Sequence, residues 1–359
     1  MSENIKYIQV ILPLDKATFV LFKNHDEKEW LIPLKNMKIG LEIYEPSAIK
    51  GKILKKGLPL LTWVRTSKNL GQFDFCRVEL VGALKDLLDS LFQNYEFSIF
   101  GGTPSTDQKI TIQIFRNKKI LGYCKIGTSK RTHDLFIHEK DILTVLENSN
   151  MSYVPRCKGV FKLDDTTSAF IQTTEKKVGA KVEHKFGTKH KLFLRTLFTK
   201  TKKNIAFEET DYYSSIIYLK NHITLLHKDY QKVVSKAVES VLSKYKGCHV
   251  LWGMCHRDFT PWNTCIVNNQ LFVFDFEYAL QYAPPEIDKW HFFVQTRYYE
   301  KKMNLEEIAH EFKKKYNDEQ KNFEMYLLDN ISMYILRGGL EDIKIANQKA
   351  YILSLINGM

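Results

Sequence analysis

The sequence has 359 residues, of which 44% are hydrophobic and 26% are charged. These values exclude a disordered chain, which combines low hydrophobicity with high charge, and a small scaffold that depends on disulfides. The length predicts about two domains. The formal net charge is +12, from 53 Lys and Arg residues against 41 Asp and Glu residues. Such a balance suits nucleic acid, an anionic membrane surface or an acidic small molecule, and alone does not choose among them.

The cysteines and the first residues point to a reducing compartment. The six cysteines form no C-x-x-C pair, which argues against a structural zinc site. The start, MSENIKYIQVILPLDK, lacks the basic and apolar regions of a secretory signal. No uncharged apolar run approaches the roughly 18 residues of a membrane span. We therefore expect a cytoplasmic protein, and peripheral contact with an anionic membrane stays open.

The first part of the chain reads as strands followed by a helix. Short apolar or β-branched runs at 7–12, 18–22 and 30–32 predict a β-rich N-terminal extension over residues 1–75, without a chemical motif. Over residues 76–93, apolar residues recur every three or four positions, which predicts a connecting helix.

Residues 95–175 alternate between strand patterns and one helical pattern. We expect strands at 97–100, 109–115, 120–126, 160–161 and 168–173, with a helix over 133–147. From residue 175 onward the chain becomes helical, with a long pattern over 212–245 that we expect to break near 227–230. Further helices follow over 304–356, interrupted at Gly338-Gly339.

The segment 249–293 carries the chemistry. Two apolar runs, 265–267 and 271–274, are separated by three polar residues and predict a hairpin. Asp258 and Asn263 precede this hairpin and Asp275 follows it directly, so three oxygen-bearing side chains are brought to one end. Mg²⁺ prefers oxygen ligands, and a carboxylate beside it can accept a proton from an attacking hydroxyl.

The spacing of these residues resembles the catalytic signature of kinase-like phosphotransferases. His256-x-Asp258-x-x-x-x-Asn263, followed by Asp275, is most similar to the aminoglycoside phosphotransferase/choline kinase family. The resemblance implies that Asp258 is the catalytic base and that Asn263 and Asp275 hold Mg²⁺. It also implies that His256 is structural, and that Asp288 braces the same loop.

The resemblance makes demands on the preceding residues as well. It implies a phosphate-covering loop containing Gly101 and Gly102, inside the stretch Gly101-Gly102-Thr103-Pro104-Ser105. It further implies a phosphate-binding Lys125 on the third strand of that region, paired with Glu139 on the next helix. The hinge that meets the adenine would be Gln172-Thr173.

The implied fold is α+β and two-lobed, like a protein kinase, with a β-rich small lobe, a helical large lobe and the N-terminal β-rich extension. The domains would be 1–75, 76–174 with the connecting helix and the ATP-binding lobe, and 175–359 with the catalytic and substrate lobe. The resemblance covers roughly residues 95–330. It departs from protein kinases because no G-x-G-x-x-G is present and because Asp275-Phe276-Glu277 replaces D-F-G.

The expected activity is transfer of the γ-phosphoryl group of ATP, with Mg²⁺, to a hydroxyl of a small molecule. By analogy with the family, a sugar or saccharide is the first expectation and an amino alcohol the second. One alternative is a non-catalytic nucleotide-binding pseudokinase or scaffold. Another is an atypical protein kinase, against which the short spacing between Asp275 and Asp288 argues, because it leaves no room for an activation loop. Trp262, inside the catalytic loop, contacts either substrate or core.

The charge is concentrated in one segment. Residues 176–203 hold ten Lys and Arg residues and one acid, Glu183, which accounts for +9 of the net +12. Such a run is either a solvated face or a surface that attracts an anionic acceptor or an anionic membrane. Nucleic acid is disfavoured, because no nucleic-acid-binding motif surrounds the run.

Overall fold

The computed structural model divides the chain into two compact units. The first unit comprises Met1–Thr144 and Tyr153–Lys181, and the second comprises Val145–Ser152 and Val182–Met359. The structure describes residues 6–11, 17–24, 26–46, 49–61, 73–103 and 108–358.

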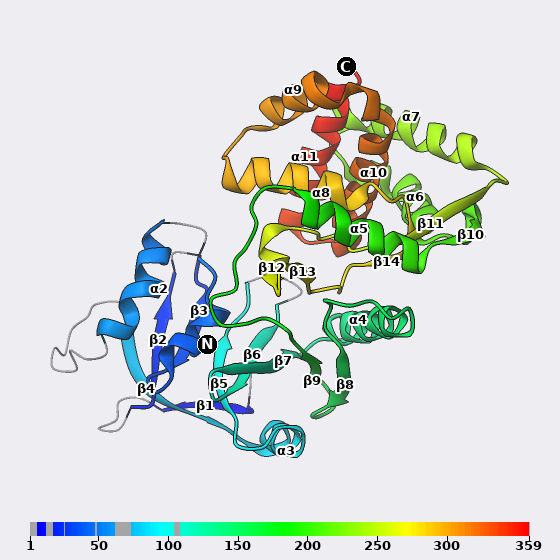
Figure 1. Ribbon diagram of the computed structural model, residues 1–359. Helices are drawn as coiled ribbons and strands as arrows, with labels where there is room; N and C mark the ends of the chain where they lie inside the picture. The colour runs from blue at the N-terminus through cyan, green and yellow to red at the C-terminus, as the bar shows by residue number, and fades with distance from the viewer. Residues whose placement is uncertain are drawn as a thin grey trace. The chain divides into compact units, whose positions relative to one another are not determined.

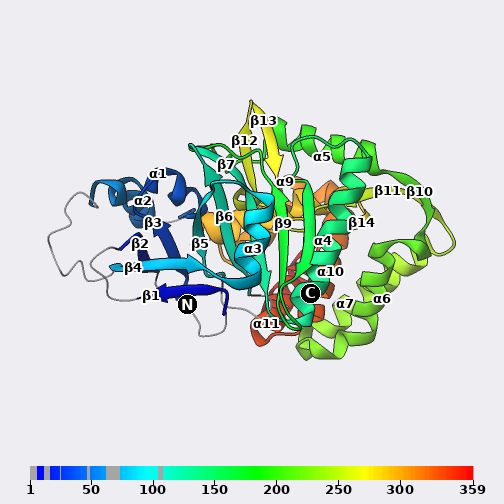
Figure 2. The same cartoon turned by 90° about the horizontal axis from the view of Figure 1, so that it is seen from below.

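Within these residues, the first unit is built on one nine-stranded antiparallel sheet (Figures 1 and 2). In spatial order its strands are β1 (Ile8–Ile11), β4 (Phe73–Leu80), β2 (Phe19–Lys23), β3 (Glu29–Pro33), β5 (Glu96–Phe100), β6 (Ile110–Arg116), β7 (Lys119–Gly127), β9 (Ser168–Thr173) and β8 (Cys157–Lys162). The strands predicted at 97–100, 109–115, 120–126, 160–161 and 168–173 are confirmed as β5, β6, β7, β8 and β9, and β8 is longer than predicted.

The N-terminal strands continue the same sheet. Strand β3 joins the later strands through the pairs Trp30↔Phe100 and Leu31↔Ile99 with β5. Figure 2 shows β1 to β4, in blue, beside β5 and β6. The β-rich extension therefore shares its hydrogen bonds and its apolar core with the strands that follow.

One expected helix is shorter than predicted. Residues 73–80 form strand β4 and not the start of a helix, which is confined to α3 (Gly82–Leu91). Residues 76–80, CRVEL, alternate apolar and polar residues with the period of a strand, so Val78 belongs to the sheet. Helix α3 buries Leu84 and Leu88 in the core of the sheet. The other helices described in this unit are α1 (Met37–Gly40), η1 (Leu41–Ile43), α2 (Ile49–Leu61) and α4 (Lys130–Asn148) up to Thr144.

The segment after β9 is fixed to the N-terminal region. Lys176 is buried; it donates a hydrogen bond to the carbonyl oxygen of Glu42 at 3.2 Å and forms an ion pair with Glu45. The Gly179 amide donates to the Glu42 carboxylate at 3.1 Å. The extension therefore holds the last residues of the first unit before the chain enters the second.

The second unit is mainly helical. Its helices are α5 (Thr188–Thr201), η2 (Phe207–Glu209), α6 (Asp211–His222), η3 (Ile223–Leu225), α7 (Lys228–Tyr245), η4 (Pro261–Asn263), α8 (Ile287–Gln295), the π-helix η5 (Thr296–Glu300), α9 (Leu305–Tyr316), η6 (Asn317–Glu319), α10 (Gln320–Arg337) and α11 (Leu340–Ile356). Helix α10 packs against α6, α7, α8 and α11 (Figure 1). The break expected near 227–230 falls between η3 and α7, and the break at Gly338-Gly339 separates α10 from α11, with Gly338 at φ 74°.

Two small sheets position the chemistry of this unit. Strand β11 (His249–Cys255) lies between β10 (Lys203–Ala206) and β14 (Leu280–Ala283). The predicted hairpin is confirmed as β12 (Thr264–Val267) and β13 (Gln270–Val273). Its turn residues Asn268 and Asn269 both have positive φ, 50° and 64°, which fits the tight turns that asparagine tolerates.

None of the helices in the described part of the chain is both long enough and apolar enough to cross a membrane.

Candidate active site

The loop that follows β11 is held from beneath by a buried carboxylate. Asp288, in the first turn of α8, accepts the backbone N–H groups of His256 and Arg257, each at 2.8 Å. Burial raises the pKa of Asp288 to about 7, against the opposing effect of the two N–H donors. Its position agrees with the bracing role that the resemblance implies.

Arg257 contributes a second brace. Its backbone is in the left-handed region at φ 66°, which is unfavourable for a residue with a side chain. The guanidinium group makes a two-pronged ion pair with the buried Asp329 of α10, with Nε to Oδ2 at 2.9 Å and an Nη to Oδ1 at 3.0 Å. This pair fixes the turn to the helical core, and Asp288 bonds to the same turn.

His256 connects the loop to the segment after β13. Its Nδ1 accepts the Asp258 amide at 3.3 Å, and its Nε2 lies 2.9 Å from the Phe274 carbonyl oxygen. Because Nδ1 accepts, the proton belongs on Nε2, and the ring is the neutral tautomer. Burial lowers the pKa of His256, which favours this neutral form. The ring therefore acts as a structural link between two loops.

The Asp258 carboxylate is engaged at both oxygens and still reaches solvent. Its Oδ2 accepts the side-chain amide of Asn263 at 2.8 Å, and its Oδ1 lies 3.0 Å from His291 Nε2. The Asp258 side chain is 32% exposed, whereas His291 is buried. The carboxylate is thus oriented from two sides and accessible to a reactant.

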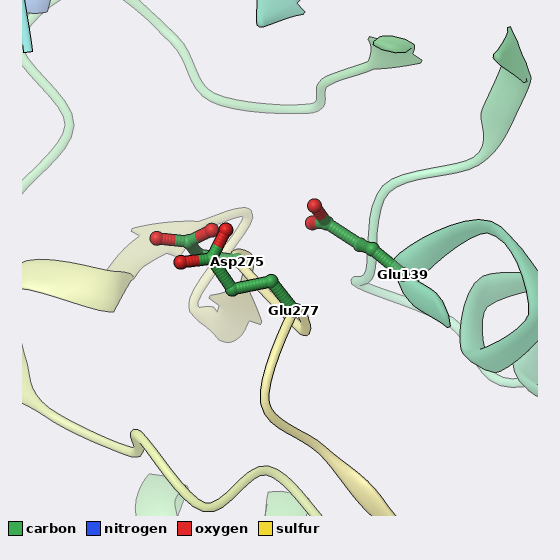
Figure 3. Close-up of side chains that lie close together, drawn as sticks. All are labelled: Glu139, Asp275 and Glu277. Atoms are coloured by element: carbon green, nitrogen blue, oxygen red, sulfur yellow. The ribbon is translucent and has the colours of Figure 1, made fainter. Parts of the chain in front are cut away.

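The segment after β13 lies beside Asn263 because of the hairpin. Asn263 directly precedes β12 and Phe274 directly follows β13, so the Phe274 amide donates to the Asn263 carbonyl oxygen at 3.1 Å. The next residue, Asp275, has φ 71°. A carboxylate oxygen of Asp275 lies within 4.8 Å of one of Glu277, and Figure 3 shows both side chains leaving the same segment.

These side chains suit a divalent cation. The side-chain amide of Asn263 donates an N–H to Asp258, and this leaves the side-chain oxygen Oδ1 of Asn263 available as a ligand. Together with the carboxylates of Asp275 and Glu277, it makes an all-oxygen donor set, which Mg²⁺ prefers. The residues of the second unit therefore fit the ion that the resemblance implies.

In the first unit, the predicted lysine and glutamate form a pair. Lys125 of β7 lies 2.7 Å from a carboxylate oxygen of Glu139 on α4, and the two side chains are 10% and 0% exposed. Figure 3 shows Glu139 on its helix. The Lys125 ammonium also lies 5.6 Å from the ring centre of Phe170 on the neighbouring strand. Strand β7 and helix α4 thus hold the Lys125 ammonium group in one orientation.

The predicted glycine loop follows β5. Gly102 has φ 87°, and a Cβ there would lie 2.3 Å from the Lys109 carbonyl oxygen, so only glycine fits. Gly101 donates its amide to the Glu29 carbonyl oxygen at 2.9 Å. Pro104 and Ser105 of the same stretch lie outside the described residues.

The predicted hinge residues end β9. Gln172 is paired with Tyr123 of β7 and is 4% exposed, and its Oε1 is buried without a hydrogen-bond partner among the described residues. The Thr173 hydroxyl accepts the amide of Arg156 at 3.0 Å. Both residues therefore lie at the end of β9, where the chain leaves the sheet.

Sequence reasoning missed three residues of the second unit's site. His291 lies three residues after Asp288, so both are on one face of α8, a spacing that could have been noticed. Glu277 lies two residues after Asp275. Asp329 is 72 positions from its partner Arg257, and no local pattern indicates that pairing.

Trp262 is 37% exposed, and its ring packs edge-on against that of Tyr299 at 5.9 Å. Of the two expectations for this residue, the core position does not hold.

The basic segment 176–203 is not one surface. Lys176 is buried against Glu42 and Glu45, and Lys189 is paired with Glu183 at 2.8 Å. Lys185, Lys191 and Arg195 are exposed at and near the start of α5. The segment therefore combines structural ion pairs with a smaller set of solvent-facing cations.

Neither a protein-family model nor a curated protein matches the sequence. The structure is similar to solved structures of aminoglycoside phosphotransferase APH(4)-Ia. A thermostable mutant in ternary complex with AMP-PNP and hygromycin B is 12% identical, with 78% of this chain and 100% of that chain covered and a TM-score of 0.52. Another structure of APH(4)-Ia is 10% identical, with 76% and 98% covered and a TM-score of 0.51.

The chain therefore has the two-lobed α+β fold of the aminoglycoside phosphotransferases, which is the protein-kinase-like fold of small-molecule kinases. The sequence resemblance predicted this fold. The N-terminal strands add to the sheet of its β-rich lobe.

Proposed function

We propose that this protein is a kinase that transfers the γ-phosphoryl group of ATP to a hydroxyl group of a small molecule. The observation that carries the proposal is the Asp258 carboxylate, which is oriented by Asn263 and His291 and is accessible to solvent. It lies on the fold of a phosphotransferase.

The proposed reaction needs one base and one electrostatic clamp. The acceptor hydroxyl donates a hydrogen bond to the Asp258 carboxylate, which takes its proton as the acceptor oxygen bonds to the γ-phosphorus. The bond between that phosphorus and the bridging oxygen breaks, and ADP leaves. A divalent cation, when bound, neutralises charge on the phosphate oxygens. Asn263 and Asp275 would hold it, with Glu277 as a third ligand.

The first unit contributes the nucleotide-binding residues of the proposal. Lys125 would bind phosphate oxygens, and Glu139, at 2.7 Å, would keep the ammonium group charged and oriented. Gly101 and Gly102 would let the loop backbone approach the phosphates, with Gly101 held in place by its bond to Glu29. Gln172 and Thr173 would meet the adenine. His256 would keep Asp258 and the segment of Asp275 in register.

The acceptor is proposed to be a sugar or an amino alcohol. The exposed ring of Trp262, four residues after Asp258, supports an acceptor with a flat apolar face or a cationic amine, because an aromatic ring binds both. The exposed cations of α5 give little support to an anionic acceptor, because they line a different face of the second unit from the one that carries Asp258.

The test is ADP release from ATP and Mg²⁺ across a panel of sugars, aminoglycosides and amino alcohols. With a productive acceptor, Asp258→Asn should lower kcat by about 100-fold or more. Asp318→Asn, at an exposed position of η6, is the matched control and should leave kcat unchanged.

A nucleotide-binding scaffold gives a different result. It would show a thermal shift with ATP and Mg²⁺ but no Asp258-dependent ADP release with any acceptor. Equal ADP release by the Asp258 variant and the wild type would also contradict the proposed base. Phosphorylation of a generic protein substrate in place of the small molecules would favour the atypical protein kinase.

A further inference from the structure

A pocket of about 900 Å³ lies between α5 and α8 of the second unit. Figure 1 shows α5 in green and α8 in orange within this unit, and His190 of α5 packs against Phe292 of α8 with ring centres 4.9 Å apart. The volume is within the range of small-molecule sites. All residues that line the pocket belong to the second unit, so the pocket is complete within it.

The rim of the pocket carries cations without acidic partners. Among the described residues, Lys185, Lys191, Arg195 and Lys301 line the pocket, are exposed and have no carboxylate within ion-pair distance. Like charges gathered in this way repel one another, and an anion at the centre would offset the repulsion.

The acids that line the same pocket are already engaged. Glu286 and Glu319 both pair with Lys289, and Glu300 lies 2.6 Å from His184 Nδ1. Lys289 and His184 themselves line the pocket, together with Arg297, which pairs with Glu311. Six Lys and Arg residues against three Glu residues give the lining a net charge of +3 with His184 neutral.

The interior of the pocket is apolar. Phe186, Leu194, Phe198 and Phe293 line it, together with Trp290. The Trp290 side chain is buried, and its Nε1–H group has no hydrogen-bond partner among the described residues. Trp290 therefore forms the buried apolar floor under the lining.

The pocket is on the opposite side of α8 from the proposed base. Asp288 and His291 project from α8 toward the loop of His256 to Asp258. Trp290, Phe293 and Arg297 line the pocket from positions three or four residues apart, which places them on another face of the same helix and its π-helical extension. A ligand here would therefore differ from the phosphoryl acceptor.

We infer that this pocket is a second ligand site, which binds a small amphipathic anion. The ligand would have an aromatic or aliphatic body inside the pocket and a phosphate, sulfate or carboxylate group at the rim, between Lys191, Arg195 and Lys301. A soluble small molecule is the occupant that the volume of the pocket and its apolar lining favour. The binding does not depend on kinase activity.

The test is a titration of the full chain with 1-naphthyl phosphate, followed by calorimetry. The naphthyl ring probes the apolar interior and the phosphate probes the rim. We expect it to bind at least about tenfold more tightly than either inorganic phosphate or 1-naphthol, because both halves contribute. Affinity for naphthyl phosphate no greater than for inorganic phosphate would overturn the inference.

Charge reversal at the rim has a matched control in the same unit. Lys191→Glu with Arg195→Glu should weaken binding by about tenfold or more. Lys232→Glu with Lys236→Glu, also exposed cations four residues apart but on α7 and away from the pocket, should leave the affinity unchanged. Equal weakening by both pairs would mean unspecific attraction to a basic protein and would contradict the site. The variants Lys191→Gln and Arg195→Gln, with circular dichroism, separate loss of binding from loss of fold.

Two further experiments test whether the probe binds the active site instead and whether the natural ligand is a lipid surface. Added ATP with Mg²⁺, and the variant Asp258→Asn, should not change the affinity for naphthyl phosphate; if they do while the rim variants do not, the probe binds the active site and the inference fails. Sedimentation with phosphatidylserine vesicles tests a lipid surface. Vesicle binding that depends on Lys191 and Arg195, without binding of naphthyl phosphate, would make this face a membrane contact and also overturn the inference.

Discussion

Lys125 and Glu139 lie on a strand and a helix, whereas Asp258 lies on a loop whose conformation depends on residues from other elements. The ion pair of Lys125 with Glu139 in the first unit follows from the positions of β7 and α4. The loop of the second unit is held by Asp288 of α8 and by Asp329 of α10, and one of its residues, Arg257, has positive φ. Two regular elements place the Lys125–Glu139 pair, whereas the loop of Asp258 depends on buried carboxylates of α8 and α10.

The largest expected effect comes from removing the brace of the loop. Asp329→Ala leaves the Arg257 guanidinium buried and without its carboxylate, and a guanidinium cannot lose its proton. We expect a loss of about 3–5 kcal/mol in the free energy of unfolding. Urea unfolding followed by tryptophan fluorescence measures it.

The exposed Asp318 provides the control for this substitution. Asp318→Ala should change the free energy of unfolding by less than about 0.5 kcal/mol. If Asp329→Ala is equally mild, the loop does not depend on the buried ion pair, and the contrast between the two units is lost.

A smaller loss is expected for the strand and helix pair. Lys125→Met removes the cation beside the buried Glu139, but a carboxyl group can be neutralised by a proton, unlike a guanidinium group. The cost should be about 1–3 kcal/mol, less than for Asp329→Ala. The same urea titration compares them, and a larger loss for Lys125→Met would reverse the comparison. The matched reference is Lys119→Met, at an exposed position of the same strand.

A further expected effect is a pH dependence that belongs to Asp288. Its pKa is about 7 in the folded protein and about 4 when unfolded, so between these values the folded state holds more protons. Its contribution to stability is therefore fully present below pH 4 and decreases as the pH rises to about 7. The decrease should be absent from Asp288→Asn, which keeps one acceptor oxygen and costs about 1–2 kcal/mol at low pH.

The measurement is the free energy of unfolding from urea titrations at several pH values, for the wild type and for Asp288→Asn. The difference between the two proteins separates the contribution of Asp288 from those of other buried groups. His190, for example, has its pKa lowered to about 4 by burial, and it makes stability rise with pH between about 4 and 6.5. A wild-type minus variant difference that does not change with pH would contradict a raised pKa for Asp288.

The sequence predicts those parts of the molecule whose structure is determined by residues close together in the chain. The β12–β13 hairpin, the order of strand, lysine, helix and glutamate, and the loop from His256 to Asn263 all lie within short stretches. The pairing of Arg257 with Asp329 joins positions 72 residues apart, and nothing in either neighbourhood indicates it.

Two other features escaped prediction for related reasons. Over 73–80, a few apolar residues fit a helical period as well as a strand period, and pairing with β1 and β2 selects the strand. Lys176 reads as one cation in a basic run, and only the tertiary structure places it against Glu42 and Glu45.

The pairing of β3 with β5 has a consequence for how the chain can be shortened. If residues before β4 were removed, β5 would become an edge strand with unpaired amide and carbonyl groups, and the rings of Phe75 and Phe100 would lose Phe22 and Trp30 as neighbours. Exposed apolar edges of this kind recruit other chains. A truncated protein would therefore be expected to self-associate through the exposed edge of β5.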